Sequence, residues 1–164
     1  SLAMKSEPLE VKIGKLLTAE NLTFAVAESC TGGLVGHRVT DVPGSSTYFL
    51  GGIVAYAYDV KERLLSVRHN TLYDHGAVSA ETASEMARGV RRALSTDIGL
   101  SVTGIAGPGG GMPDKPVGLV FIALSARDGE RCERHIWDGD RSENKARSAE
   151  AALDLLRRYL EETP

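Results

Sequence analysis

The sequence predicts a single layered α/β domain built around a mixed sheet. Helical apolar patterns alternate along the chain with short apolar strands, as in folds whose strands are joined by crossover helices. Two consecutive strands, at 117–126 and 131–137, flank a turn sequence and predict an antiparallel hairpin. The 164 residues, 42% of them hydrophobic, are enough for one core and contain no internal repeat or linker. We therefore expect one domain over 1–164, with 1–5 as a flexible or cloning-derived end.

The first third of the chain predicts a helix, a strand and a second helix. Pro8 is typical of a helix start, and apolar residues then recur at helical spacing. Residues 23–28 are interpreted as a short buried strand. A Gly-Gly pair opens the second helix, which turn residues at 42–45 end.

The middle of the chain predicts a strand-like stretch followed by two helices. Residues 48–58 are rich in β-forming side chains but contain two glycines, so they predict either two strands or one strand with a bulge. A short helix follows, with Asp59 as its expected N-cap and Lys61 in its first turn. After a polar loop, a longer helix is expected from Ser79, its N-cap, to about residue 94.

The last third combines a glycine-rich loop, the hairpin and a final helix. Residues 98–104 predict a strand that runs into the loop 104–116. Asp128-Gly129 is expected to make the hairpin turn. Asp140, with Glu143 three residues on, has the pattern of a capping box at the start of the last helix.

Composition excludes several classes of function. A formal charge of −3 and a pI near 5.8 favour neither nucleic acid nor an anionic membrane as a partner. No stretch reaches the ~18–20 apolar residues of a membrane span, and no signal peptide is evident, so a cytoplasmic protein is expected. The two cysteines have no zinc-like spacing, and we expect neither a metal nor a cofactor.

The segment AESCTGG places Ser29 where a buried strand turns into a helix. The first N–H groups of that helix lack intrahelical partners and suit an anion, either a phosphate or the oxyanion of an attacked carbonyl. Gly32 and Gly33 would let the backbone come close to a ligand. Ser29 or Thr31 can equally be a simple helix cap, so the motif alone leaves nucleophile and cap open.

A serine nucleophile needs a base, and the sequence offers lysine more readily than histidine. None of the four histidines follows a strand beside a carboxylate, apart from His75 after Asp74 in a surface turn. Lys61 closes AYAYDVK, after the strand expected beside that of Ser29, and a Ser-Lys pair is a known variant of the catalytic triad. The hydroxyl of Tyr56 could pass a proton or orient the amine. Taken singly, a solvated lysine and a packed aromatic side chain are the commoner interpretations.

Other candidates carry less weight. Cys30 is a stronger nucleophile as a thiolate, but a free cysteine is usually a small buried hydrophobe. The S-x-x-K spacing at 142–145 lacks its partner motifs and is attributed to chance. The loop TGIAGPGGG is not a P-loop, and GDR at 139–141 joins a helix start to a guanidinium, which suits phosphate.

In combination, AESCTGG, TDVPGSS, YFLGG, HGAVS, VTGIAGPGGG and GDR resemble the CinA C-terminal domain family over nearly the whole chain. Standalone members of that family are the bacterial nicotinamide mononucleotide deamidases (PncC). The resemblance implies a three-layer α/β/α domain. It also implies a metal-free amidohydrolase that converts nicotinamide mononucleotide to nicotinate mononucleotide and ammonia in pyridine-nucleotide recycling.

The resemblance implies roles for particular residues. Ser29 would be the nucleophile, Lys61 its general base and Tyr56 an assisting hydroxyl. Backbone N–H groups would form an oxyanion or phosphate cradle, and further residues would line the ligand site. The substrate-binding set is Cys30, Thr31, Gly32, Gly33, Thr103, Gly104 and Arg141.

Two alternatives to a serine amidase stay open: a non-catalytic nucleotide-binding module, acting as a sensor or partner subunit, and a cysteine amidase through Cys30. The chain departs from many relatives at Tyr58, where they carry a polar residue such as asparagine. A change there could alter specificity. We expect a mononucleotide as the small-molecule partner, and a homo-oligomer.

Overall fold

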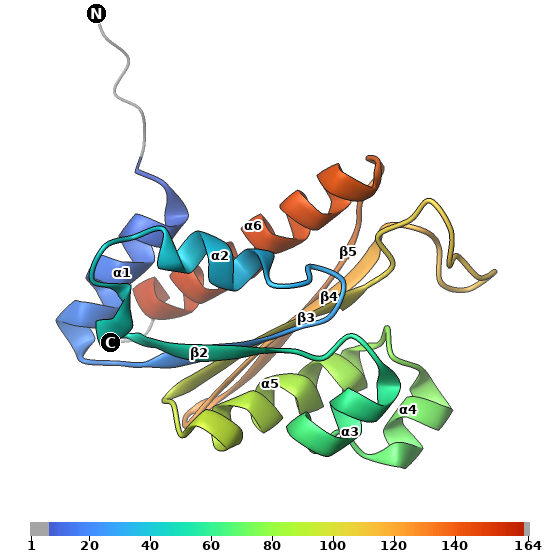
Figure 1. Cartoon of the computed structure of the whole chain (residues 1–164), viewed down its shortest axis with the longest axis horizontal. Coiled ribbons are helices and arrows are strands. Elements are labelled where there is room, and N and C mark those ends of the chain that lie inside the picture. Colours follow the sequence, from blue (N-terminus) through green and yellow to red (C-terminus); the bar gives the residue numbers. More distant parts are fainter. Residues whose placement is uncertain (1–6, 163–164) are drawn as a thin grey trace, which may run out of the picture.

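The computed structural model describes residues 7–162 and contains a five-stranded mixed sheet between two layers of helices, as Figure 1 shows. The strands are β1 (Phe24–Glu28), β2 (Phe49–Val54), β3 (Ile98–Gly104), β4 (Leu119–Ala126) and β5 (Gly129–Ile136). They lie in the order β2-β1-β3-β4-β5. β1 is parallel to both its neighbours, and β4 is antiparallel to both β3 and β5. The predicted three-layer α/β/α fold is confirmed.

The helices divide between the two faces of the sheet. One layer contains α1 (Leu9–Glu20), α2 (Leu34–Thr40) and α6 (Arg141–Glu162), and the other contains α3 (Tyr58–Leu65), α4 (His69–His75) and α5 (Ala80–Leu94) (Figure 1). A short 3-10 helix, Ser45–Thr47, precedes β2. The connection after β1 therefore enters one layer, and the connection after β2 enters the other.

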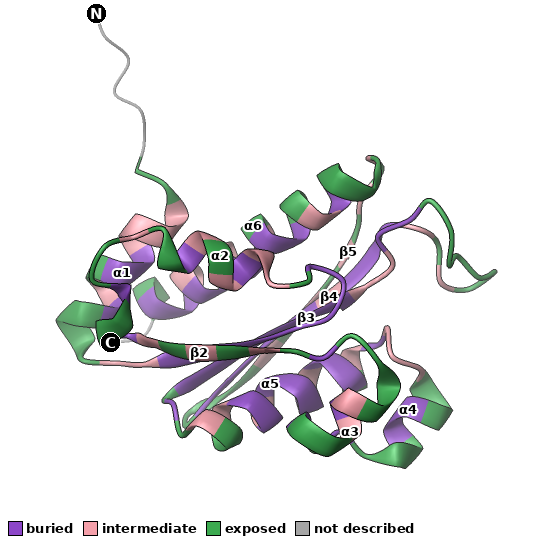
Figure 2. Cartoon of the chain, viewed as in Figure 1, coloured by how far each residue is buried: buried purple, intermediate pink, exposed green. Residues whose placement is uncertain are grey.

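Each layer has its own apolar core, and β1 belongs to both. Phe24 and Val26 pack with α1, α2 and α6, whereas Ala25 and Ala27 pack with α3, α4 and α5. Figure 2 shows the central strands β1, β3 and β4 and the helix faces that meet them as buried, whereas the outer strands β2 and β5 are half-buried or exposed. A strand buried on both faces reads as a continuous apolar run, which is why the sequence pattern predicted it.

Close backbone contact fixes α3 on α5. A Cβ atom on Gly89 of α5 would lie only 1.8 Å from the carbonyl oxygen of Leu65, the last residue of α3. Only glycine permits this approach, so α3 is held tightly against α5. The position of α3 matters because it carries Lys61.

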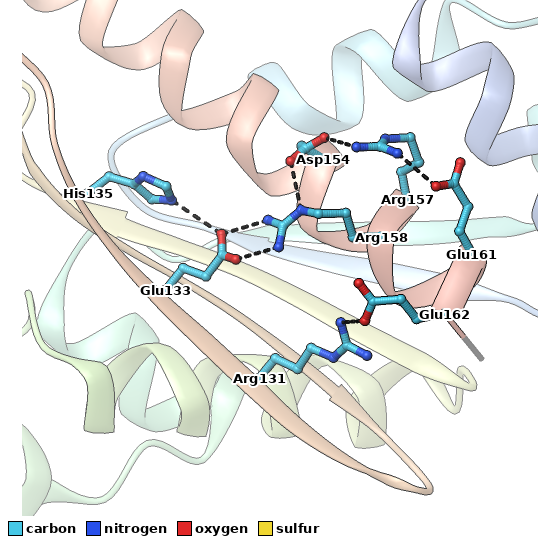
Figure 3. A network of polar contacts seen from close by, with 8 residues as sticks. All are labelled: Arg131, Glu133, His135, Asp154, Arg157, Arg158, Glu161 and Glu162. Atoms are coloured by element: carbon cyan, nitrogen blue, oxygen red, sulfur yellow. Dashed lines mark hydrogen bonds and ion pairs between the residues drawn. The ribbon is translucent and has the colours of Figure 1, made fainter.

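An ionic network holds the end of α6 on the outer strand β5 (Figure 3). Arg158 of α6 bonds Glu133 of β5 through two of its nitrogens and also pairs with Asp154 one turn earlier. Arg131 of β5 pairs with Glu162 at the far end of the helix. The charges sit at the rim of the layer, where partial solvation limits their contribution to stability.

Three local predictions from the sequence are wrong. Residues 69–75, expected as loop, form α4. Ala57, not Asp59, occupies the N-cap position of α3; Asp59 lies in the first turn and pairs with Arg63. The hairpin loop is Arg127-Asp128, because Gly129 already pairs with Ala126.

Several local predictions are confirmed. Ser79 caps α5 by accepting the Thr82 N–H at 3.1 Å. Asp140 and Glu143 form a reciprocal capping box at the start of α6. Residues 48–58 contain one strand with an irregularity, since Leu50 is skipped in the register against β1.

Candidate active site

Ser29 lies at the carboxyl end of β1, where the connections of two neighbouring parallel strands separate. The β1 connection passes to α2 in one layer and that of β2 passes to α3 in the other. Such a point in a parallel sheet opens a crevice beyond the strand ends. The Ser29 N–H donates to the Val102 carbonyl of β3 at 2.9 Å, which holds the corner on the sheet.

Lys61 lies against Ser29 from the other side of this crevice. Its Nζ lies 2.9 Å from Ser29 Oγ, and it donates to the carbonyl oxygens of Ala55 at 2.8 Å and Tyr56 at 3.2 Å. Parallel pairing explains the proximity, because Glu28 is in register with Val54 and the two strands end together. The side chain is only 1% exposed.

Burial changes the acid–base behaviour of this lysine. Removing the ammonium from water disfavours its charged form and lowers the pKa of Lys61 from 10.5 to about 8. No carboxylate pairs with Lys61 among residues 7–162, and only the neighbouring Cys30 acts weakly to raise its pKa again. A substantial neutral fraction is therefore available near neutral pH, as a general base requires.

Tyr56 contributes to the site through two different groups. Its carbonyl oxygen accepts from Lys61, whereas its hydroxyl accepts from Arg141 at 3.2 Å. The ring is 61% exposed at the mouth of the crevice. The expected hydroxyl contact with the lysine amine is thus replaced by a main-chain contact.

Arg141, the first residue of α6, brings a guanidinium to the crevice from the opposite layer. It donates to the Gly107 carbonyl in the glycine-rich loop at 2.8 Å as well as to the Tyr56 hydroxyl. No carboxylate of the described chain pairs with it. The side chain is positioned by neutral oxygens, and no carboxylate neutralises its guanidinium.

A cavity of about 200 Å³ joins these groups. Thr103 and Gly104, at the end of β3, are part of its wall, and the Thr103 hydroxyl donates to the Ala77 carbonyl. The wall contains two cationic side chains and no carboxylate. The lining residues are Ser29, Cys30, Tyr56, Lys61, Ala77, Val78, Thr103, Gly104, Ala106 and Arg141.

Glu28 is the residue that the sequence analysis missed. Its carboxylate, 2% exposed, accepts from the Thr31 hydroxyl at 2.6 Å and from the N–H groups of Gly33, Val35 and Gly36 at 3.0–3.2 Å. A lone glutamate at the end of an apolar strand, next to a helix start, was the available signal. A buried carboxylate requires donors, and a helix N-terminus supplies them.

The expected cradle must be corrected accordingly. The N–H of Gly33 is taken by Glu28, that of Gly32 donates to the Ser29 carbonyl, and the Thr31 side chain is buried away from the cavity. Of the amides at 29–36, those of Cys30 and Thr31 alone donate to no other residue of the described chain. These two amides follow Ser29 directly, which is where acyl-transfer enzymes place oxyanion donors.

Cys30 lines the cavity but is poorly suited to be the nucleophile. Its side chain is 7% exposed and joins the core of the α1, α2 and α6 layer. Burial raises the pKa of the thiol to about 11, although the nearby lysines Lys61 and Lys145 act in the opposite direction. The thiolate is the reactive form, so this cysteine is largely unreactive near neutral pH.

The other side chains considered in the sequence lie elsewhere. None of the four histidines lines the cavity. No group of three or more potential metal ligands among His, Cys, Asp and Glu gathers in residues 7–162. In the same part of the chain, no helix has the length and apolar character needed to span a membrane.

Comparison with known sequences identifies close relatives. A relative from Halothermothrix orenii, whose name describes it as competence-damage inducible, is 55% identical over 150 residues, 91% of this chain and 36% of its own length. A CinA-like protein of Chloroherpeton thalassium is 52% identical over 157 residues, 93% of this chain and 37% of its own length. The chain thus spans little more than a third of the curated relatives it matches.

Solved structures match over nearly their whole length. The competence/damage inducible protein CihA from Agrobacterium tumefaciens has a TM-score of 0.86 at 36% identity and covers 98% of this chain and 100% of its own. Competence damage-inducible protein A from Klebsiella pneumoniae has a TM-score of 0.92 at 30% identity, covering 95% and 97%. The family model described as the CinA C-terminal domain matches residues 6–160, and the chain belongs to this family.

Proposed function

We propose that this protein is a serine amidohydrolase that releases ammonia from the carboxamide of nicotinamide mononucleotide, yielding nicotinate mononucleotide. The observation that carries the proposal is the contact between Lys61 Nζ and Ser29 Oγ at 2.9 Å. The substrate follows from the resemblance of the motifs to those of nicotinamide mononucleotide deamidases, and a cavity wall with cations and no carboxylate suits an anionic nucleotide.

The three contacts of the Lys61 amine support its role as the base. Protonated, the amine donates to Ser29 and to the carbonyls of Ala55 and Tyr56. Once neutral, it keeps two N–H groups, which can stay on the two carbonyls. Its lone pair is then directed at the Ser29 hydroxyl, the geometry in which an amine accepts the proton of a nucleophile.

The reaction divides into two acyl-transfer steps. Ser29 Oγ attacks the carboxamide carbon while its proton passes to Lys61, and the N–H groups of Cys30 and Thr31 receive the developing oxyanion. Protonated Lys61 then gives its proton to the leaving nitrogen, and ammonia departs from an acyl-serine. A water molecule attacks the acyl-serine while its proton passes to Lys61. As the ester bond breaks, Lys61 returns that proton to Ser29 Oγ, and the carboxylic acid product loses its own proton to solvent as nicotinate mononucleotide leaves.

The test is ammonia release from nicotinamide mononucleotide by the wild type and four variants. Ser29→Ala and Lys61→Met should each lower kcat by about a thousandfold or more, since each removes a group that acts in the bond-making step. Ser45→Ala, a serine equally buried elsewhere, and Lys15→Met, an exposed lysine, should keep wild-type activity. Saturable nucleotide binding without ammonia release by the wild type would instead favour a non-catalytic binding module.

A further inference from the structure

The phosphate of a mononucleotide cannot use the start of α2, where the sequence placed its cradle. The Glu28 carboxylate already accepts three N–H groups of that helix start. A second anion at the same donors would meet a buried negative charge at close range. The anionic part of a substrate must therefore be held by another part of the site.

The cations of α6 fall into two groups. Three arginines of this helix have carboxylate partners: Arg147 pairs with Asp138, Arg157 with Asp154 and Glu161, and Arg158 with Glu133 and Asp154. Arg141 and Lys145 have no carboxylate partner within the described chain. They lie four residues apart, one turn along the same face of the helix. This face carries the two uncompensated charges of α6.

Both uncompensated cations are directed toward the Ser29 corner. Arg141 lines the cavity and is held by the Gly107 carbonyl and the Tyr56 hydroxyl. The Nζ of Lys145 lies 3.8 Å from the point that a Cβ on Gly32 would occupy, and its charge partly opposes the rise that burial causes in the pKa of the Cys30 thiol. Gly32 is exposed and has a φ of +62°, so the space beside Lys145 is free of side chain and open to solvent.

We infer that Arg141 and Lys145 form the subsite for the phosphate monoester of the substrate, with Lys145 as the residue that selects nucleotides over nucleosides. This inference rests on the proposed amidase function, of which it names the substrate class. A guanidinium bonds two phosphate oxygens at once, and an ammonium adds a point charge that can follow the group. The amide end of the substrate needs only Ser29, Lys61 and the two amides after Ser29. The two cations thus act on binding and not on the bond that breaks.

The experiment compares a phosphorylated and an unphosphorylated substrate. Ammonia release from nicotinamide mononucleotide and from nicotinamide riboside is measured for the wild type, Lys145→Gln and Arg147→Gln. Lys145→Gln should raise KM for the nucleotide by about tenfold or more, since it removes a charge-assisted bond, and leave kcat within about twofold. Its kcat/KM for the riboside should be that of the wild type. Arg147→Gln removes a charge from the same helix. It should leave kcat and KM for both substrates unchanged, because Arg147 is exposed and paired with Asp138.

Two results would overturn the inference: an unchanged KM for the nucleotide in Lys145→Gln, or an equal loss of kcat/KM for both substrates. Calorimetric titration of nicotinamide mononucleotide into Ser29→Ala, with and without Lys145→Gln, gives a readout that does not depend on turnover. Suppose that the wild type releases no ammonia but Lys145→Gln still weakens nucleotide binding by about tenfold. The proposed amidase activity is then contradicted, while the proposed phosphate subsite is supported. If binding is unaffected, the subsite fails whatever the activity.

Discussion

The amine of Lys61 and the carbonyl oxygen of Ala55, 2.8 Å apart, are both buried and belong to the same short segment that leaves β2. A main-chain carbonyl stabilises an ammonium less than a carboxylate does, because it carries only a partial charge. The lysine is therefore oriented without being fixed in its charged form, and its pKa of about 8 follows from burial.

The rate should depend on pH through Lys61. We expect kcat/KM for nicotinamide mononucleotide to rise about tenfold per pH unit below pH 8 and to level off above it, because only the neutral amine is a base. At pH 7 about a tenth of the enzyme would carry the neutral amine. The measurement is a pH–rate profile from pH 6 to 9.5. A profile that is flat below pH 8 would contradict the assignment of Lys61 as the base.

Stability should also depend on pH through the same group. The folded pKa lies below the unfolded value, so from about pH 8 upward the unfolded chain binds more protons and the free energy of unfolding rises. Between pH 7 and 9 this contribution amounts to about 1.4 kcal/mol. The measurement is urea unfolding of the wild type and Lys61→Met at pH 7 and at pH 9. The free energy of unfolding of the wild type, relative to that of Lys61→Met, should be higher at pH 9 by this amount. Above pH 9, Cys30 acts in the opposite direction, because its thiol keeps its proton longer in the folded state.

Replacing Glu28 should damage both the fold and the rate. In Glu28→Gln, a carboxamide with one acceptor oxygen and an NH₂ group faces donors that now oppose it. We expect the free energy of unfolding to fall by about 2 kcal/mol or more, and kcat to fall by a larger factor than KM changes. Glu10→Gln is the matched control, since Glu10 pairs with Arg38 outside the site and is itself partly buried. Wild-type stability of Glu28→Gln would show that the four hydrogen bonds contribute little.

Thiol reagents should separate the two candidate nucleophiles. At pH 8 about a thousandth of Cys30 would be thiolate, whereas Cys132 is exposed on β5. We expect iodoacetamide to label Cys132 first, as mass spectrometry of peptides would report, while ammonia release is retained. Cys30→Ala keeps the backbone N–H and should keep most of the activity. Loss of ammonia release in step with labelling of Cys30 would point to a cysteine amidase.

The sequence predicted the layers and the strands because apolar periodicity is strongest where an element is buried. β1 is a nearly continuous apolar run, β3 has apolar residues at 98, 100 and 102, and α5 begins at a residue with clear capping chemistry. It missed α4, whose exposed face leaves only Thr71 and Leu72 buried, too few to make an apolar stripe. It misplaced the start of α3 because Ala57 takes the extended conformation of an N-cap without a side chain that signals it.

For the site, the sequence placed Ser29 and Lys61 after neighbouring strands, and the structure has them in contact for that reason. The catalytic roles of both residues stay predictions. The allocation of N–H donors could not be read from AESCTGG, because it depends on the rotamer of Glu28 and on which amides its carboxylate reaches. The position of Lys145 beside Gly32 depends on the packing of α6 against the α2 layer, which no local pattern specifies.

The double burial of β1 has a mechanical consequence. Ser29 is tied by Glu28 to α2, which belongs to one helical layer, whereas Lys61 is carried by α3 in the other layer. Sliding of one layer over the sheet would pull the pair apart, while motion of a surface loop would not. The central sheet thus keeps the Lys61 amine within hydrogen-bond distance of the Ser29 hydroxyl. Shear between the two helical layers is the deformation that would break this contact.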